Sequence, residues 1–473
     1  MSRLIDDEVF FATATELGRL LRTREVSSVE LTQAFLDRLE ALGPRYHALA
    51  ELARDLALGQ ARRADRALSR GAREQDRAHW PLLGVPYGAK DLLATTGIPT
   101  RWGSPAHRHQ VFDYDATVIR RLAEAGAVLL GKLAMVELAG GGGYEYANAS
   151  ADGPGLNPWN LNHWSGGSSS GSGSAVAAGL VPYALGSETW GSIVTPSAFC
   201  GVTGLRPTWG LVSRHGAMEL AWSMDKVGPM ARSAEDCGWV LHAIAGADPR
   251  DPTSGSARFA FNPRLPRRRW HLGILPADFT DAPALERAFD DALRVLRRAG
   301  MRLQSVALPD HPYEETARTL LNGEMAAAHA EFIASPGLDE LVDAGQKAGL
   351  RGALELRASD YVRAQQRRVE ITRSVLALFE EVDALVAPTL MTEAPTLDTN
   401  LKATFRRRGG YSVLGALCGV PALSVPMGFG RQGLPLGLSF TGDRLSENTL
   451  VAIGMIFQRE TDWHRRRPPA LRA

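Results

Sequence analysis

The sequence predicts an α/β protein: an α/β/α sandwich with a large, mostly parallel mixed central sheet covered by helices on both faces. Short apolar runs typical of buried strands alternate along the chain with helical stretches, which is the pattern of parallel sheets with helices on both sides. Of the 473 residues, 45% are apolar, which is enough to bury a large core. Large α/β enzymes of this length often form one unit, so we expect a single domain over residues 1–473.

The elements begin with an N-terminal helical segment over residues 13–72. Residues 13–42 are expected to form two helices. Ser27 and Glu30 have the spacing of a capping box, which marks the start of the second helix. The Ala- and Arg-rich residues 51–72 continue the segment in helical style.

Two stretches after this segment predict the first strands of the sheet. Residues 80–95, WPLLGVPYGAKDLLAT, form a short apolar run interrupted by Gly and Pro, as expected for a buried strand. Residues 115–133 predict a helix, a turn at Ala125 and Gly126, and a second buried strand.

The remaining chain alternates loops, helices and short strands. Residues 140–173 are rich in Gly, Ser and Asn and predict a loop, and the NPWNLNHW run within it is not strand-like. Residues 315–382 are mostly helical by periodicity, and we expect residues 310–382 to form a helical cover near the substrate site. The C-terminal runs PALSVPMGF and PLGLSF predict further strands.

Composition excludes several classes of function. The formal net charge is +1, from 53 basic and 52 acidic residues, so no nucleic-acid partner is indicated. The first residues do not form a secretory signal, and no apolar run is long enough to span a membrane. The three separated cysteines indicate neither a disulfide framework nor a zinc site, and His107 with His109 lacks a third metal ligand. We therefore expect a cytoplasmic protein without metal or cofactor.

The most unusual stretch is SGGSSSGSGSA at residues 165–175. It has the composition of a flexible linker, but an apolar helix follows it and no charged or Pro-rich run flanks it. Gly167, Ser169 and Gly171 match the G-x-S-x-G nucleophile elbow, although that motif should follow a strand of the sheet. A phosphate-binding loop is a weaker alternative, because no G-K-[ST] follows.

A fourth interpretation joins this loop to Lys90 in GVPYGAKD and to Ser192 in GSETWGSIVTPSAFCG. Together these segments resemble the amidase signature family, which carries a Lys after a GVP-type strand, a GGSSGG loop and a serine-bearing G-[ST]-D-x-G-G-S-I-R turn. The resemblance extends over nearly the whole chain. Its other motifs are DATVIRRLAEAGAVLLGK at 115–132, NPWN at 157–160, FCGVTGLRPTWG at 199–210, DKVGPMARSAEDC at 225–237, LVAPTL at 385–390, GVPALSVPMGF at 419–429, GLPLGLSF at 433–440 and TDWHRRRPP at 461–469.

The resemblance implies a serine hydrolase that cleaves C–N bonds through an acyl-enzyme, with a Ser–cis-Ser–Lys triad. Ser192 would be the nucleophile, Ser168 would relay its proton, and Lys90 would accept it. Lys90 must then be neutral at rest, and burial could lower its pKa; the alternative is a surface lysine paired with Asp91. The backbone N–H groups of the nucleophile turn would form the oxyanion hole, and a supporting hydroxyl is expected beside the triad. The turn residues are Thr189, Trp190, Gly191 and Ser192, and the supporting residue is Ser169.

The sequence departs from the family pattern in the nucleophile turn. Glu188 replaces the usual Asp, Trp190 the usual Gly, and Val194 the usual Arg, which removes a partner of the acidic residue. Trp190 is expected to pack into the core rather than point toward the acyl pocket. Ser170 stands where the family has Gly, which predicts mild backbone strain.

The family's substrate loop corresponds to AGGGGYEYANAS at residues 139–150. Tyr144, Tyr146 and Gly142 are candidate substrate-binding residues, although the tyrosines could equally be core aromatics. Met135, expected in a helix, is a further candidate, but a helical Met is more often part of the core.

Three alternatives of function remain. The substrate of a stand-alone hydrolase could be an amide, an aryl ester or a carbamate (urethane), and a homodimer is expected because family members often are dimers. The glutaminase subunit of a tRNA-dependent amidotransferase is the second candidate. Its glutamine-binding Asp would fall at Gly409, and its EVKRR segment has no counterpart. The third is a non-catalytic scaffold that kept the fold.

Overall fold

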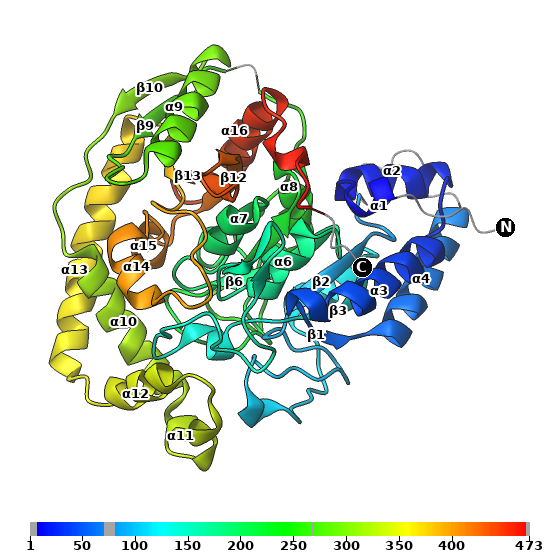
Figure 1. Cartoon of the computed structure of the whole chain (residues 1–473), viewed down its shortest axis with the longest axis horizontal. Coiled ribbons are helices and arrows are strands. Elements are labelled where there is room, and N and C mark those ends of the chain that lie inside the picture. The colour runs from blue at the N-terminus through cyan, green and yellow to red at the C-terminus, as the bar shows by residue number, and fades with distance from the viewer. Residues whose placement is uncertain (1–6, 71–80, 267, 470–473) are drawn as a thin grey trace.

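An eleven-stranded mixed sheet runs through the part of the chain that this computed structural model describes, residues 7–70, 81–266 and 268–469. Figure 1 shows the sheet crossing the molecule between layers of helices. In spatial order its strands are β1 (Leu49–Leu52), β3 (Val128–Leu133), β2 (Pro86–Lys90), β6 (Tyr183–Glu188), β8 (Lys226–Ala231), β7 (Thr203–Arg206), β12 (Ala422–Phe429), β13 (Pro435–Gly442), β11 (Ala384–Pro388), β9 (His271–Ile274) and β10 (Arg302–Ser305).

Parallel pairing is concentrated in two groups of strands. The strands β3, β2 and β6 are parallel, and so are β11, β9 and β10. The strands between these groups pair antiparallel, as does β1 at the edge. In the first group, α5 (Thr117–Glu124) leads into β3, and α6 (Ser170–Ala177) leads into β6. The predicted order of strand, helix and strand in this part of the chain is confirmed.

Helices cover both faces of the sheet, which confirms the predicted α/β/α class. On one face, α7 (Val194–Cys200) lies so close to β13 that a Cβ on Gly437 would be 2.5 Å from the Cβ of Ala198. On the other face, Phe457 of α16 (Glu447–Arg459) contacts Phe440 of β13 edge to face. Because side chains alternate along a strand, residues 437 and 440 point to opposite sides. The helix α8 (Ala234–Ile244) packs beside α16.

The N-terminal segment begins with α1 (Asp7–Phe10) and continues with α2 (Ala14–Thr23), α3 (Ser28–Leu42) and α4 (Arg54–Ser69). The predicted capping box of Ser27 and Glu30 is confirmed, since each side chain bonds to the other residue's backbone N–H. The carboxylate of Asp236 on α8 accepts hydrogen bonds from the backbone of residues 14 and 15, which ties α2 to the body of the protein. The helical prediction is wrong for Glu51 and Leu52, which pair with β3 as part of β1, a contact that exists only in the folded sheet. Residues 71 and 72 of the predicted segment lie outside the described residues.

A group of helices lies along one side of the molecule (yellow-green to orange in Figure 1). It consists of α10 (Tyr313–Ala328), α11 (Ala330–Ile333), α12 (Ala344–Ala353), α13 (Ala358–Ala377), α14 (Leu401–Arg408) and α15 (Val413–Cys418). Buried residues of α10, α13 and α15, among them Leu320, Ile371 and Leu417, form a second core cluster together with Leu385 and Ala387 of β11. The prediction that residues 315–382 are mostly helical is confirmed by α10, α11, α12 and α13, whereas a cover near the substrate site stays a prediction.

The prediction that NPWNLNHW is not strand-like is wrong. Residues Asn160–Trp164 form β5, which pairs antiparallel with β4 (Leu156–Asn157) in a separate two-stranded sheet. Trp164 at the end of β5 is fully buried and anchors the run, whereas Asn162 in the same strand is exposed. The hairpin is not part of the central sheet, so it does not supply the strand that a nucleophile elbow requires.

Candidate active site

Lys90 is the last residue of β2, and parallel pairing brings the end of β6 beside it. Its ammonium nitrogen Nζ donates to Ser168 Oγ at 2.7 Å and to Ser187 Oγ at 3.0 Å. The side chain of Lys90 is completely buried. The carboxyl ends of two neighbouring parallel strands thus bring together a lysine and two serines that lie far apart in the sequence.

Burial lowers the pKa of Lys90 to about 7, although the negative charges of Asp225 and Glu188 act in the opposite direction. An amine with this pKa is largely available as a neutral base near neutral pH. The alternative pairing with Asp91 is not found, because Asp91 forms a buried ion pair with Lys132 at 3.6 Å. The contacts of Lys90 therefore suit proton transfer.

Ser168 lies in the glycine–serine loop, and the Gly167–Ser168 peptide bond is cis. The backbone N–H of Val136 donates to the Ser168 carbonyl at 3.1 Å. Gly167 has no space for a side chain, because a Cβ there would be 2.7 Å from Val136 Cγ2. The loop is therefore packed tightly against the chain segment that follows β3, unlike a flexible linker.

Ser169 and Ser170 continue this loop into α6. Ser169 Oγ donates to the carbonyl of Ser187 at 3.2 Å and accepts from the Ser187 N–H at 3.3 Å, so it fixes the end of β6. Ser170 is the first residue of α6 and is not among the residues with positive φ. The predicted strain at Ser170 is therefore not found, because an ordinary helical backbone accepts serine at this position.

Ser192 lies in the turn between β6 and α7 and keeps 9% of its surface exposed. Gly191 before it has φ +88°, a conformation that favours glycine. The Ser192 carbonyl accepts a hydrogen bond from the Ser169 N–H at 3.4 Å, which links the two serine loops. Within the described residues, the structure gives Ser192 Oγ no hydrogen bond to Ser168.

Glu188 holds the nucleophile turn from inside. One carboxylate oxygen accepts from the backbone N–H groups of Ile193 and Val194, at 2.8 and 3.1 Å, and the other accepts from Arg206 at 2.8 Å. Although burial acts to raise the pKa of Glu188, the positive charges of Arg206 and Lys226 lower it overall. Arg206 therefore supplies the basic partner that position 194 lacks. The sequence analysis gave this residue no role, because β7 comes near the end of β6 only in the folded sheet, where β8 lies between the two strands.

The guanidinium group of Arg206 needs the glycine at position 415 of α15. A Cβ on Gly415 would lie 1.9 Å from the Arg206 Cζ atom, far inside van der Waals contact. Arg206 also donates to the carbonyl of Val420 at 3.1 Å. The position of the buried arginine is thus fixed from both β6 and the segment around α15.

The backbone N–H groups of Trp190, Gly191 and Ser192 have no hydrogen-bond acceptor in the parts of the chain that are described. The side chain of Trp190 packs half-buried against the core cluster of α10, α13 and α15, with the Arg318 guanidinium 5.7 Å above its ring. Thr189 Oγ1 donates to Asp225 at 2.5 Å. The turn therefore has unused donors, while its bulky side chain is directed to the helical cover.

The predicted substrate-binding residues occupy different environments. Tyr144 is half-buried beside the serine loop, its hydroxyl 3.1 Å from the place that a Cβ on Gly167 would occupy. Tyr146 is 40% exposed. The Gly142 N–H donates to the sulfur of Met325 on α10 at 2.8 Å. Met135 is fully buried in a non-helical segment after β3, so its expected place in a helix is wrong and its core alternative describes it better.

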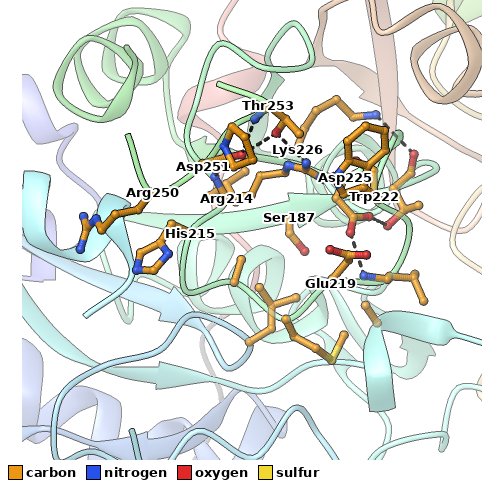
Figure 2. A pocket seen from close by; sticks show the side chains of 18 residues that line it. Ser187, Arg214, His215, Glu219, Trp222, Asp225, Lys226, Arg250, Asp251 and Thr253 are labelled. Carbon is orange, nitrogen blue, oxygen red and sulfur yellow. Dashed lines mark hydrogen bonds between the residues drawn. The ribbon is translucent and has the colours of Figure 1, made fainter. Parts of the chain in front are cut away.

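A cavity of about 200 Å³ opens beside the end of β6. Figure 2 shows Ser187, Glu219 and Asp225 on its wall, together with Lys226. Burial and the charge of Arg206 lower the pKa of Lys226 to about 7, and its ammonium group donates to the carbonyls of Thr189 and Gly415. The sequence analysis did not single out these four residues. Three of them, Ser187, Asp225 and Lys226, lie within segments that resemble family motifs, which was the available signal, whereas Glu219 lies outside those segments.

Comparison with known proteins identifies the family of this chain. The chain matches the family model described as Amidase over residues 30–451. It is 38% identical to AmiD of Mycobacterium tuberculosis (strain ATCC 25618 / H37Rv), a provisionally named amidase, over 99% of this chain and 98% of that protein. It is also 38% identical to a glutamyl-tRNA(Gln) amidotransferase subunit of Roseiflexus castenholzii, over 96% and 97% of the two chains.

A solved structure agrees with these sequence matches. The native peptide amidase of Stenotrophomonas maltophilia superposes with a TM-score of 0.85 at 33% identity, covering 98% of this chain and 99% of that one. Almost nothing of either chain is left out of this match. The protein therefore belongs to the amidase signature family of hydrolases.

Proposed function

We propose that this protein is a serine hydrolase that cleaves the C–N bond of small linear amides through an acyl-enzyme. One observation carries the proposal: a completely buried lysine donates a 2.7 Å hydrogen bond to a serine, with a pKa lowered to about 7. A buried lysine that serves only stability is usually paired with a carboxylate. A lysine that contacts hydroxyls can instead accept a proton through them.

In the proposed first step, Ser192 Oγ attacks the amide carbonyl carbon. Its proton passes to Ser168 Oγ, whose own proton passes to neutral Lys90. Collapse of the tetrahedral intermediate breaks the C–N bond, and the proton returns through Ser168 to the leaving amine. A water molecule then attacks the carbonyl carbon of the acyl-enzyme, and the same proton transfers release the carboxylic acid and restore Ser192. The scheme requires a hydrogen bond between the two serines during the reaction, and the 3.4 Å bond from the Ser169 N–H to the Ser192 carbonyl supports their proximity.

The oxyanion of this intermediate needs preorganised donors. We assign them to the backbone N–H groups of Thr189, Trp190, Gly191 and Ser192. Those of the last three have no acceptor within the described chain, so they are free to bind a developing negative charge. Glu188 supports the assignment, because it holds the following two N–H groups and thereby fixes the turn.

The same acyl-enzyme route would serve aryl esters and carbamates (urethanes), and we propose them as further substrate classes. Each presents a carbonyl carbon to Ser192 and a leaving group that accepts the proton from Ser168. No helix within the described ranges is both long and apolar enough to cross a membrane. The expected cytoplasmic location and homodimer stay predictions.

The relationship to a glutamyl-tRNA(Gln) amidotransferase gives a second candidate function, glutamine hydrolysis within a complex. The position expected for the glutamine-binding carboxylate is Gly409, which ends α14 and carries no side chain. Release of ammonia from glutamine by the purified protein, compared with release from simple amides, distinguishes the two candidates. A stand-alone amidase should hydrolyse the simple amides and leave glutamine largely intact.

The test of the main proposal needs no known substrate. The protein is treated with a fluorophosphonate probe, and the intact mass and the labelled peptide are measured. We expect one adduct on Ser192, none in Ser192→Ala, and slow labelling in Lys90→Ala. Lys402→Ala, which changes an exposed lysine, serves as the matched control and should label like the wild type.

Two other outcomes count against the proposal. An adduct on Ser169 would favour the nucleophile elbow. No adduct, under conditions that label a known serine hydrolase, would favour a scaffold without a working oxyanion hole.

A further inference from the structure

The cavity beside the proposed triad contains charged side chains of both signs. Ser187, whose Oγ accepts from Lys90, lines it, and so does Thr189 at the start of the nucleophile turn. A substrate bound at Ser192 could therefore extend a substituent into this space. The charge that remains uncompensated on the wall decides which substituent fits best.

The basic groups on the wall are engaged by other protein groups. Arg214 donates to the carbonyl of Trp222 at 2.5 Å and to Thr253 Oγ1 at 2.6 Å. Arg250 forms an ion pair with Asp248 at 3.3 Å. The ammonium group of Lys226 donates to two backbone carbonyls and is almost completely buried. All three basic side chains therefore already have partners within the described protein.

The acidic side of the wall differs. Asp225 accepts from Thr189 Oγ1 and from the N–H groups of Leu220 and Ala221, so its position is fixed. The carboxylate of Glu219 has no hydrogen bond or ion pair to any described residue, and it lies in the cavity with that of Asp225 (Figure 2). Partial burial and the charge of Asp225 raise the pKa of Glu219, while Arg214 acts in the opposite direction. A bound cation would relieve this repulsion.

An aromatic side chain completes the wall. Trp222 is 50% exposed, which is unusual for a tryptophan, and it lines the same cavity. Its ring stands edge to face against Trp209, which keeps it in place. An exposed indole beside two carboxylates is the combination that binds ammonium and guanidinium groups.

We propose that Glu219 is a specificity-determining residue that favours amides carrying a cationic group, such as a primary ammonium. The inference rests on the proposed amidase function and adds the class of substrate. Asp225 supplies a second negative charge, and Trp222 supplies the aromatic face.

The test compares three amides of similar length: 6-aminohexanamide, which is cationic, heptanamide, which is neutral, and adipic acid monoamide, which is anionic. The ratio of kcat/KM for the cationic to the neutral amide is measured for the wild type, Glu219→Gln and Glu219→Lys. We expect the wild type to favour the cation about fivefold or more, the gain of one partly exposed ion pair. Glu219→Gln should remove most of this preference, and Glu219→Lys should reverse it.

Glu331→Gln, which changes an exposed carboxylate on α11, is the control and should keep the wild-type ratio. An unchanged ratio in Glu219→Gln, or a wild-type preference for the anionic amide, would overturn the inference while leaving the amidase proposal intact. If the wild type hydrolyses none of the three amides and the fluorophosphonate does not label Ser192, both proposals are wrong.

Discussion

Two lysines at the ends of adjacent parallel strands are both completely buried, yet their surroundings differ. Lys132 on β3 has a carboxylate partner, Asp91, at 3.6 Å, and donates to the Leu93 carbonyl and to Thr100 Oγ1. Lys90 on β2 contacts the hydroxyls of two serines and no carboxylate of the described chain. Burial lowers the pKa of Lys132 to about 8 and that of Lys90 to about 7. Equal burial thus produces an ion pair in one case and a candidate base in the other.

The largest expected effect is a loss of catalytic activity when Lys90, but not Lys132, is replaced. Lys90→Met should lower kcat/KM for an amide by roughly 10²–10⁴-fold, the range of general acid–base catalysis. Thermal unfolding should show no loss of stability, since the substitution leaves no buried carboxylate unpaired. A large drop in Tm with activity retained per folded molecule would instead assign Lys90 to structure.

The matching change at the other lysine should affect stability. Lys132→Met leaves Asp91 buried without its partner and should lower the free energy of unfolding by about 3–5 kcal/mol. Denaturant titration measures this loss, and Lys132→Met/Asp91→Asn should recover part of it. Steady-state rates per folded molecule should stay near those of the wild type, and a loss comparable to that of Lys90→Met would break the distinction.

The pH dependence follows from the charge state of Lys90. Because the base must be neutral, kcat/KM should rise about tenfold per pH unit below pH 7 and level off above it. Asp225→Asn removes a negative charge that raises the pKa of Lys90, so the inflection should move to lower pH. A rate that is constant between pH 5 and pH 9 would exclude Lys90 as the titrating base.

The smallest effect concerns the hydroxyl neighbours. Ser187→Ala removes one acceptor from Lys90 and should lower kcat/KM about fivefold, the value of one hydrogen bond of about 1 kcal/mol. Thr100→Val makes the equivalent change at Lys132 and should reduce stability instead. Parallel measurement of rates and unfolding for both variants shows whether each hydroxyl acts on chemistry or on folding.

Local patterns in the sequence were sufficient for much of the fold. The capping box at Ser27 and Glu30 and the strand that ends at Lys90 depend on neighbouring residues, and both are present. The β4–β5 hairpin was missed because its asparagines hide the strand period, and the burial of Trp164 that stabilises it is a tertiary effect.

The candidate site also contains features that the sequence predicted and features that only the fold reveals. Family motifs pointed to Lys90 and Ser168, which the fold brings into hydrogen-bond contact. Arg206 and Asp225 also lie in family motifs, but their contacts with the nucleophile turn could not be predicted, since these depend on strand pairing and on the path of a distant loop. Sequence patterns identified groups with conspicuous chemistry and missed the charges that hold them in place.

The missing side chain of Gly415 has a genetic consequence. Any other residue there would collide with the Arg206 guanidinium, whose partner Glu188 fixes the turn that carries Ser192. A selection for loss of activity should therefore recover changes at position 415 as readily as changes at position 192. No active-site reagent would ever label that position, so such alleles would look unrelated to the chemistry until they were placed on the structure.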